Sequence, residues 1–141
     1  MMTANYHTHT ARCRHAVGSD EEYVLYAIDA GIKTLGFADH CPYPGFDGDY
    51  YSGYRMYCED LGDYCESVRS LREKYKGQIK ILLGLETEYY PRLFKGLLDF
   101  IHPYGIEYLI LGQHYLDDDQ YGVWTRWAKS EEELIKYVDQ C

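Results

Sequence analysis

The sequence lacks the features that mark membrane, secreted or nucleic-acid-binding proteins. No apolar run approaches the roughly 18 residues that a membrane span needs. The opening MMTANYHTHT has neither the charged nor the apolar region of a signal peptide. Basic residues are few, with 14 Lys and Arg against 23 Asp and Glu, and the net charge of −9 indicates no basic face for a nucleic-acid backbone. We therefore expect a cytoplasmic protein with neither a membrane nor a nucleic-acid partner.

Metal-binding cysteine motifs and linkers are also missing. The five cysteines are odd in number and match no zinc-ribbon spacing, so free thiols in a reducing compartment are expected. No low-complexity segment, repeat or linker divides the 141 residues, which favours a single domain. Tyrosine is abundant, with 17 residues, and His7, His9 and His15 fall close together near the start of the chain.

Strand-like and helix-like segments alternate along the chain. Apolar runs predict strands at 4–9, 33–38, 78–85 and 107–111. Helical spacing covers 57–75 and 92–100, and capping boxes at Ser19 and Ser130 predict two more helix starts. This alternation predicts an α/β protein with right-handed βαβ units and a parallel sheet. A closed (β/α) barrel usually needs about 250 residues, so the chain is too short to close one.

Each predicted strand is followed by a side chain of the kind that binds metals. His7 and His9 end the first strand, His40 the second, Glu86 the third and His114 the fourth. In parallel sheets the carboxyl ends of the strands meet at one rim. Taken singly, each residue has an explanation without metal: His40 as a histidine near a helix N-terminus, and Glu86 as a carboxylate in an ion pair. Together they favour a cation, because burying such groups without one costs several kcal/mol. Nitrogen and oxygen ligands suit Zn²⁺, Mn²⁺ or Fe²⁺.

The sequence resembles the polymerase-and-histidinol-phosphatase (PHP) superfamily in five ordered segments: NYHTHT, RCRHAVGS, LGFADHCPYP, GLETEYYP and LGQHYL. Within that superfamily it most resembles the histidinol-phosphatases of histidine biosynthesis. The resemblance implies that residues 1–141 are the N-terminal part of a PHP domain, a distorted (β/α)7 TIM-like barrel with three divalent metal ions at its rim. It also implies hydrolysis of a small-molecule phosphate monoester, L-histidinol phosphate, to L-histidinol and phosphate.

The resemblance also implies which residues bind each ion. Carried over residue by residue, the ligands are His7, His9 and Glu86 for one ion, Glu86 and His114 for a second, and His15 and His40 for the third. Two other acidic residues, Asp39 and Glu88, are expected to orient ligands rather than bind metal.

The sequence departs from the family pattern after His114. PHP enzymes take another histidine and a late Asp-x-His pair as ligands, and no histidine follows His114 here. We therefore expect a fragment without the C-terminal half of the barrel. Two alternatives stay open: a truncated chain without catalytic competence, and a PHP phosphoesterase that acts on nucleic acid, which the acidic composition disfavours.

The loop at 41–55 is expected to lie over the rim, because it follows the strand that ends at His40. Arg55 is its only basic residue, and it lies among four tyrosines: Tyr43, Tyr50, Tyr51 and Tyr54. A guanidinium there is predicted to pair with the substrate phosphate, while the tyrosines enclose the imidazole end of histidinol. The alternative is that Arg55 is a surface residue and the tyrosines only pack the loop.

Overall fold

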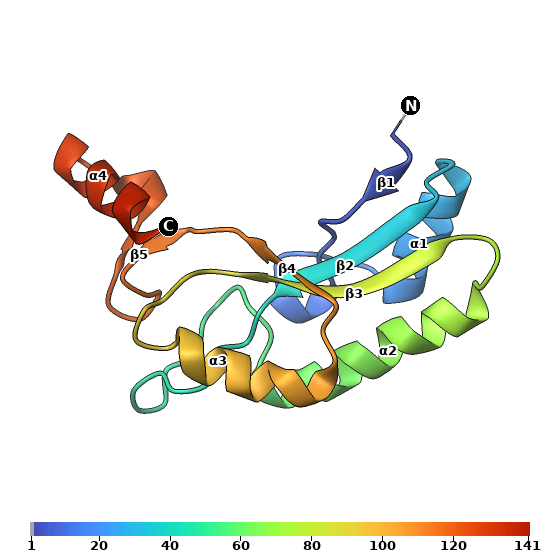
Figure 1. Cartoon of the computed structure of the whole chain (residues 1–141), viewed down its shortest axis with the longest axis horizontal. Coiled ribbons are helices and arrows are strands. Elements are labelled where there is room, and N and C mark those ends of the chain that lie inside the picture. The colour runs from blue at the N-terminus through green and yellow to red at the C-terminus, as the bar shows by residue number, and fades with distance from the viewer. Residues whose placement is uncertain (1) are drawn as a thin grey trace.

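A computed structural model describes residues 2–141, in which four parallel strands form one sheet in chain order (Figure 1). The strands are β1 (Ala4–Asn5), β2 (Thr34–His40), β3 (Lys80–Thr87) and β4 (Tyr108–Leu111). Thr34 lies opposite Ala4 on one side and Lys80 on the other, and Gly84 lies opposite Tyr108. The predicted α/β class, with sequential parallel strands, is confirmed.

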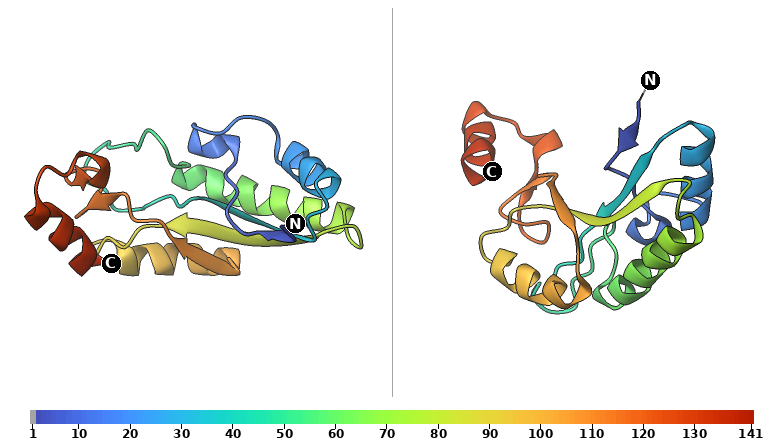
Figure 2. Two further views of the ribbon diagram at one scale, coloured as in Figure 1. Left: turned by 90° about the horizontal axis from the view of Figure 1, so that it is seen from above. Right: turned by 45° about the vertical axis from the view of Figure 1, so that its right-hand side comes forward.

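Three helices connect these strands and cover one face of the curled sheet (Figure 2). They are α1 (Asp20–Asp29), α2 (Leu61–Lys74) and α3 (Phe94–Ile101). A fourth helix, α4 (Glu131–Gln140), lies beyond the sheet near the C-terminus. Short 3-10 turns are η1 (Ala11–Cys13), η2 (Cys58–Asp60), η3 (His102–Tyr104) and η4 (Thr125–Trp127). Within residues 2–141, no helix has the length and apolarity to cross a membrane.

The core lies between the sheet and these helices. Phe37, Leu83 and Leu85 from the strands are buried with Val68 of α2 and Leu97 of α3. Side chains alternate along a strand, so the residues between them face the opposite side of the sheet. The packing of the helices therefore leaves the other face of β2 and β3 to form the rim and the inner surface.

Tyr108 covers part of that inner surface. Its hydroxyl donates to the carbonyls of Tyr6 (2.7 Å) and Phe37 (3.0 Å). Glycines at 36 and 84 make room for the ring, because a Cβ at Gly84 would lie 2.7 Å from Cε2 of Tyr108. The ring thus ties β4 to β2 across β3.

Two details differ from the sequence prediction. The first strand ends at Asn5 rather than residue 9, because the Asn5 side chain accepts the backbone N–H of His7 (3.0 Å) and so interrupts the strand pairing. The chain still contacts β2 further on, since the Thr8 carbonyl accepts from the backbone of Ala38 (2.9 Å). Residues after β4 form an antiparallel pair, β5 (Tyr115–Leu116) and β6 (Val123–Trp124), which the sequence analysis did not predict.

The two predicted capping boxes have different outcomes. At α1 the box is complete: Ser19 accepts from the backbone of Glu22, and the Glu22 side chain accepts from the backbone of Ser19. At α4 Ser130 accepts from the backbone of Glu133 (3.2 Å), but the Glu133 carboxylate accepts from Lys129 instead (2.6 Å). Only half of the second box forms.

Candidate metal centre

The carboxyl ends of the parallel strands bring the predicted ligands to one rim. His40 ends β2 and lies directly opposite Glu86 of β3 in the strand register. The other predicted ligands lie in the segments that follow β1 and β4: His7, His9, His15 and His114. The prediction that His7 and His9 lie within the first strand was wrong, since both follow it. They nevertheless meet at the same place.

Glu86 lies at the centre of this group and is only 3% exposed. Its Oε2 lies 3.0 Å from Nε2 of His7, 3.2 Å from Nε2 of His9 and 3.4 Å from Nδ1 of His40. Its Oε1 lies 3.9 Å from Nε2 of His114. One carboxylate therefore touches or approaches four imidazoles.

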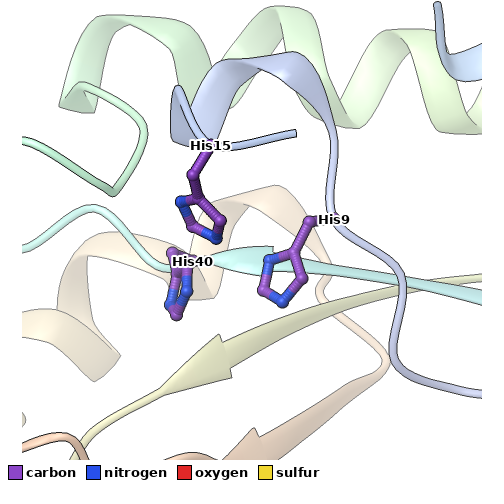
Figure 3. Close-up of side chains that lie close together, drawn as sticks. All are labelled: His9, His15 and His40. Atoms are coloured by element: carbon purple, nitrogen blue, oxygen red, sulfur yellow. The ribbon is translucent and has the colours of Figure 1, made fainter. Parts of the chain in front are cut away.

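Three of the histidines form a cluster of their own (Figure 3). The ring centroids of His9 and His40 lie 4.6 Å apart, and His15 lies 5.2 Å from His9 and 4.9 Å from His40. Their ligand nitrogens all lie within 4.8 Å of one another. The same spacing holds for two other sets: His7, His9 and Glu86; and His40, Glu86 and His114. The sets share members, which is the arrangement of a multinuclear site.

These residues fit a divalent cation. Within residues 2–141, the buried Nδ1 atom of His40 has no hydrogen-bond partner. A buried nitrogen without a partner costs about 1–3 kcal/mol, and a bound cation removes that cost. All six predicted ligands offer nitrogen or carboxylate oxygen, as Zn²⁺, Mn²⁺ and Fe²⁺ prefer.

The electrostatics of the cluster also favour positive charge. Burial opposes protonation of His9, but contacts with Asp39, Cys13 and Glu86 raise its pKa to about 11. Burial likewise opposes ionisation of Glu86, yet the neighbouring His9, His40 and His7 lower its pKa to about 2. Burial lowers the pKa of His40 to about 3, so its ring is neutral and able to act as a ligand. The carboxylates thus stabilise a cation where a metal would bind.

Asp39 supports the ligands without belonging to the Glu86 group. It is fully buried, accepts the backbone N–H of His40 (2.8 Å) and that of Thr10 (3.2 Å), and binds the Thr10 hydroxyl. Its Oδ1 lies 3.4 Å from Nδ1 of His9. These contacts place Asp39 beside two predicted ligands, and its role in orienting them stays a prediction.

Glu88 also points toward the rim but has different neighbours. It is fully buried and contacts both the backbone and the ring of His114. Burial opposes its ionisation, but His114 and Arg55 lower its pKa below the usual range. It lies beside one predicted ligand, His114, and its role in orienting that ligand stays a prediction.

The prediction that Arg55 pairs with the substrate phosphate is wrong, because the side chain is buried and its donors are already used. It is 2% exposed, and its guanidinium makes four hydrogen bonds, to Asp119, Cys41, Glu88 and Tyr90. A guanidinium already paired with two carboxylates has no open edge for bidentate binding of a phosphate. The alternative of a surface residue is also wrong.

Sequence reasoning missed two contributors to the site. Cys13 was treated only as a free thiol, yet its Sγ lies within 4.8 Å of the possible ligand atoms of His9 and Asp39 and 3.7 Å from Nε2 of His15. Gly112 provides space for Glu86, since a Cβ there would lie 2.6 Å from Cδ of Glu86. The family motif contains this glycine, but only the tertiary structure reveals its role.

A cavity of about 320 Å³ opens beside the histidines. Its lining residues are His15, His40, His114, Tyr54, Tyr115 and Trp124. The Tyr54 and Tyr115 rings are nearly parallel at 5.8 Å, and Tyr115 and Trp124 are nearly parallel at 6.2 Å. One side of the cavity is therefore imidazole and the other is a wall of aromatic faces. Of the loop tyrosines singled out in the sequence, only Tyr54 reaches it.

Comparison with known proteins agrees with this geometry. The family model for the PHP domain matches residues 5–140. A "probable histidinol-phosphatase" of Deinococcus radiodurans is 34% identical over 110 residues, which cover 78% of this chain and 41% of that protein. The histidinol-phosphatase of Bacillus subtilis is 29% identical over 120 residues, which cover 80% of this chain and 44% of that protein.

A solved structure shares the fold. It is the histidinol phosphate phosphatase of Lactococcus lactis complexed with Zn, L-histidinol and phosphate, with a TM-score of 0.70 and 22% identity. The match covers 92% of this chain and 47% of that one. The chain thus spans less than half the length of these relatives, and the described sheet corresponds to one side of their TIM-like barrel.

Proposed function

The chain belongs to the PHP domain family, and from this premise we propose that it carries metal-binding and substrate-binding parts of a histidinol-phosphatase active site. The reaction is hydrolysis of L-histidinol phosphate to L-histidinol and phosphate. Residues 1–141 are part of a PHP domain in this proposal, and the protein acts in the cytoplasm. The observation that carries the proposal is Glu86, one buried carboxylate with four imidazoles around it at the strand ends.

The possible ligand residues form overlapping groups, each of which would hold one metal ion. His7, His9 and Glu86 would hold one ion, and Glu86 and His114 a second. His40 lies near the second position, with Nδ1 3.4 Å from Oε2 of Glu86. The cluster of His9, His15 and His40 offers a third position. Divalent ions bound in this way lower the pKa of water and neutralise the phosphoryl oxygens, which a slow monoester hydrolysis requires.

The chain's own residues prepare that site. Asp39 lies 3.4 Å from Nδ1 of His9, and Glu88 lies 3.4 Å from Nδ1 of His114, so each carboxylate holds one imidazole. Ligands held in advance need little reorganisation when substrate binds. The net charge of −9 is then offset locally by the ions, so a dianionic substrate can approach the rim.

The aromatic cavity would receive the organic part of the substrate. With the phosphate at the metal centre, the imidazole and ammonium groups of L-histidinol phosphate would lie against Tyr54, Tyr115 and Trp124. Aromatic faces attract cations and stack with planar rings. This cavity, and not Arg55, is the proposed substrate contact within residues 2–141.

The proposal is tested by phosphate release and by metal content. We expect the full-length enzyme to release phosphate from L-histidinol phosphate, to stop after chelation, and to resume when Zn²⁺, Mn²⁺ or Fe²⁺ is added. The 141-residue chain is expected to retain metal after dialysis. Glu86→Gln should remove that metal, whereas Glu107→Gln, at an exposed glutamate paired with Arg72, should not. Phosphate release that is insensitive to prolonged chelation would refute the proposal.

A further inference from the structure

A buried chain of charged groups leads from the loop after β2 to His114. Arg55 donates from Nε to Oδ2 of Asp119 (3.0 Å) and from Nη2 to Oε1 of Glu88 (2.9 Å). All three side chains are shielded from solvent. Buried ion pairs contribute little net stability compared with apolar packing, so such a triad invites a role beyond holding the fold.

Glu88 uses both of its oxygens on His114 and its neighbour. Oε2 accepts the backbone N–H groups of His114 (2.8 Å) and Tyr115 (3.0 Å). Oε1, which also accepts from Arg55, lies 3.4 Å from Nδ1 of His114. An ionised carboxylate only accepts hydrogen bonds, so this contact requires the ring proton on Nδ1. The lone pair of Nε2 then faces Glu86, whose Oε1 is 3.9 Å away.

We propose that Arg55 is a positioning residue for the metal centre: it fixes Glu88, and Glu88 fixes the His114 tautomer that presents Nε2 to a metal ion. Asp119 holds Arg55 in place from the other side. Metal-binding histidines commonly donate their second ring nitrogen to a carboxylate, which sets both tautomer and ring orientation. Arg55 therefore acts through Glu88 and does not touch the substrate.

Arginine suits this position better than lysine. The guanidinium also donates to the carbonyl of Cys41 (3.1 Å) and to the hydroxyl of Tyr90 (3.2 Å), so four partners surround one planar group. Its donors are arranged in a rigid fork, and a lysine ammonium cannot reach the same set at once. Tyr43, Tyr54 and Tyr90 also lie with ring centroids 5.1–5.8 Å from the guanidinium carbon.

The tautomer of His114 can be measured without any metal. Nitrogen-15 NMR of the 141-residue chain, at a pH where the His114 ring is neutral, reports which ring nitrogen carries the proton. We expect Nδ1–H in the unaltered chain. In Glu88→Gln the amide oxygen still accepts from the two backbone N–H groups, while the amide nitrogen replaces Oε1, loses the hydrogen bond from Arg55 and donates to Nδ1. The ring proton should therefore move to Nε2, and one Zn²⁺ equivalent should bind about 10- to 100-fold more weakly.

Two arginine variants test the role of Arg55. Arg55→Lys keeps the charge but loses the fork, so we expect a mixture of tautomers and about 10-fold weaker binding of one Zn²⁺. Arg92→Lys is the matched control, because Arg92 also pairs with two carboxylates, those of Asp118 (3.1 Å) and Asp47 (3.6 Å), but at the surface. It should keep the original tautomer and zinc affinity. Competition with a chromophoric chelator measures the affinities.

The inference would be overturned if Glu88→Gln retained Nδ1–H, or if Arg55→Lys matched Arg92→Lys in both measurements. Glu88→Gln is nearly isosteric, so the test does not depend on whether Arg55→Lys folds. The inference uses the metal centre of the proposed function but not its substrate. A chain that bound no Zn²⁺ would refute that function, whereas the tautomer of the metal-free chain would still decide the role of Glu88 and Arg55.

Discussion

Gly112→Ala should damage the metal centre without damaging the fold. A Cβ at this position would lie 2.6 Å from Cδ of Glu86 and 2.8 Å from its Cγ. Carbon atoms in contact prefer about 3.5–4.0 Å, so the Glu86 side chain must retreat by about 1 Å. Ligand distances in metal sites are held to about 0.2 Å, so this shift exceeds the tolerance several-fold. The φ of Gly112 is not among the left-handed values in the chain, so the backbone itself accepts alanine.

The expected loss can be expressed as stability. Zinc present at 100 times the dissociation constant of the unaltered chain stabilises it by about 2.7 kcal/mol. If Gly112→Ala weakens zinc binding about 100-fold, as the loss of a properly placed ligand implies, the stabilisation by zinc falls to about 0.4 kcal/mol. For a domain of this size the difference of about 2.3 kcal/mol corresponds to roughly 7 °C in the zinc-dependent melting temperature.

Thermal melts with and without Zn²⁺ provide the assay. Gly96→Ala is the matched control, because Gly96 lies in α3 and a Cβ there would meet nothing within 4 Å. The Gly96→Ala variant should have a slightly higher melting temperature, because alanine has a higher helix propensity than glycine. It should also keep the full zinc-dependent rise in melting temperature. If Gly112→Ala gained as much stability from zinc as the unaltered chain, the reasoning about Glu86 would be refuted.

Other predictions concern the fold and the cavity. Gly84→Ala should destabilise the chain by about 1–3 kcal/mol in urea unfolding, because its Cβ would overlap Tyr108; unchanged stability would contradict that packing. Ser19→Ala should cost about 1 kcal/mol through loss of the α1 cap, whereas Ser70→Ala, at an exposed position within α2, should cost nothing. Tyr115→Leu in the full-length enzyme should raise KM for L-histidinol phosphate but not for glycerol phosphate, and an equal effect on both would exclude the aromatic wall as the ring contact.

The arrangement of the sheet could be predicted because its signals are local. Apolar runs marked β2 and β3, and the parallel order followed from the alternation with helices. The meeting of His40 and Glu86 followed in turn, since both lie at carboxyl ends of neighbouring strands. The first strand ends at Asn5 for a reason that hydropathy does not contain, namely the hydrogen bond that the backbone N–H of His7 donates to the Asn5 side chain.

The burial of Arg55 could not be predicted, because the contacts that enclose it are not local in the sequence. A charged residue in a polar, tyrosine-rich loop is usually exposed, and composition favours that interpretation. Its actual partners, Glu88 and Asp119, lie 33 and 64 residues away along the chain. No spacing rule connects positions so far apart, so only the folded structure shows that the guanidinium is enclosed.

Glu86 and Glu88 show how far spacing can assign a role. They lie two residues apart, and both reach the same rim, as strand periodicity predicts. Their neighbours separate them: Glu86 lies beside four imidazoles, whereas Glu88 accepts from a guanidinium and two backbone N–H groups and contacts one imidazole, that of His114. A carboxylate whose oxygens already accept from fixed donors is poorly placed to bind metal. A carboxylate surrounded by imidazoles, which can themselves be metal ligands, is well placed. The different roles of these two acids therefore originate in contacts from other parts of the chain. These are His7, His9, His40 and His114 for Glu86, and Arg55, His114 and Tyr115 for Glu88.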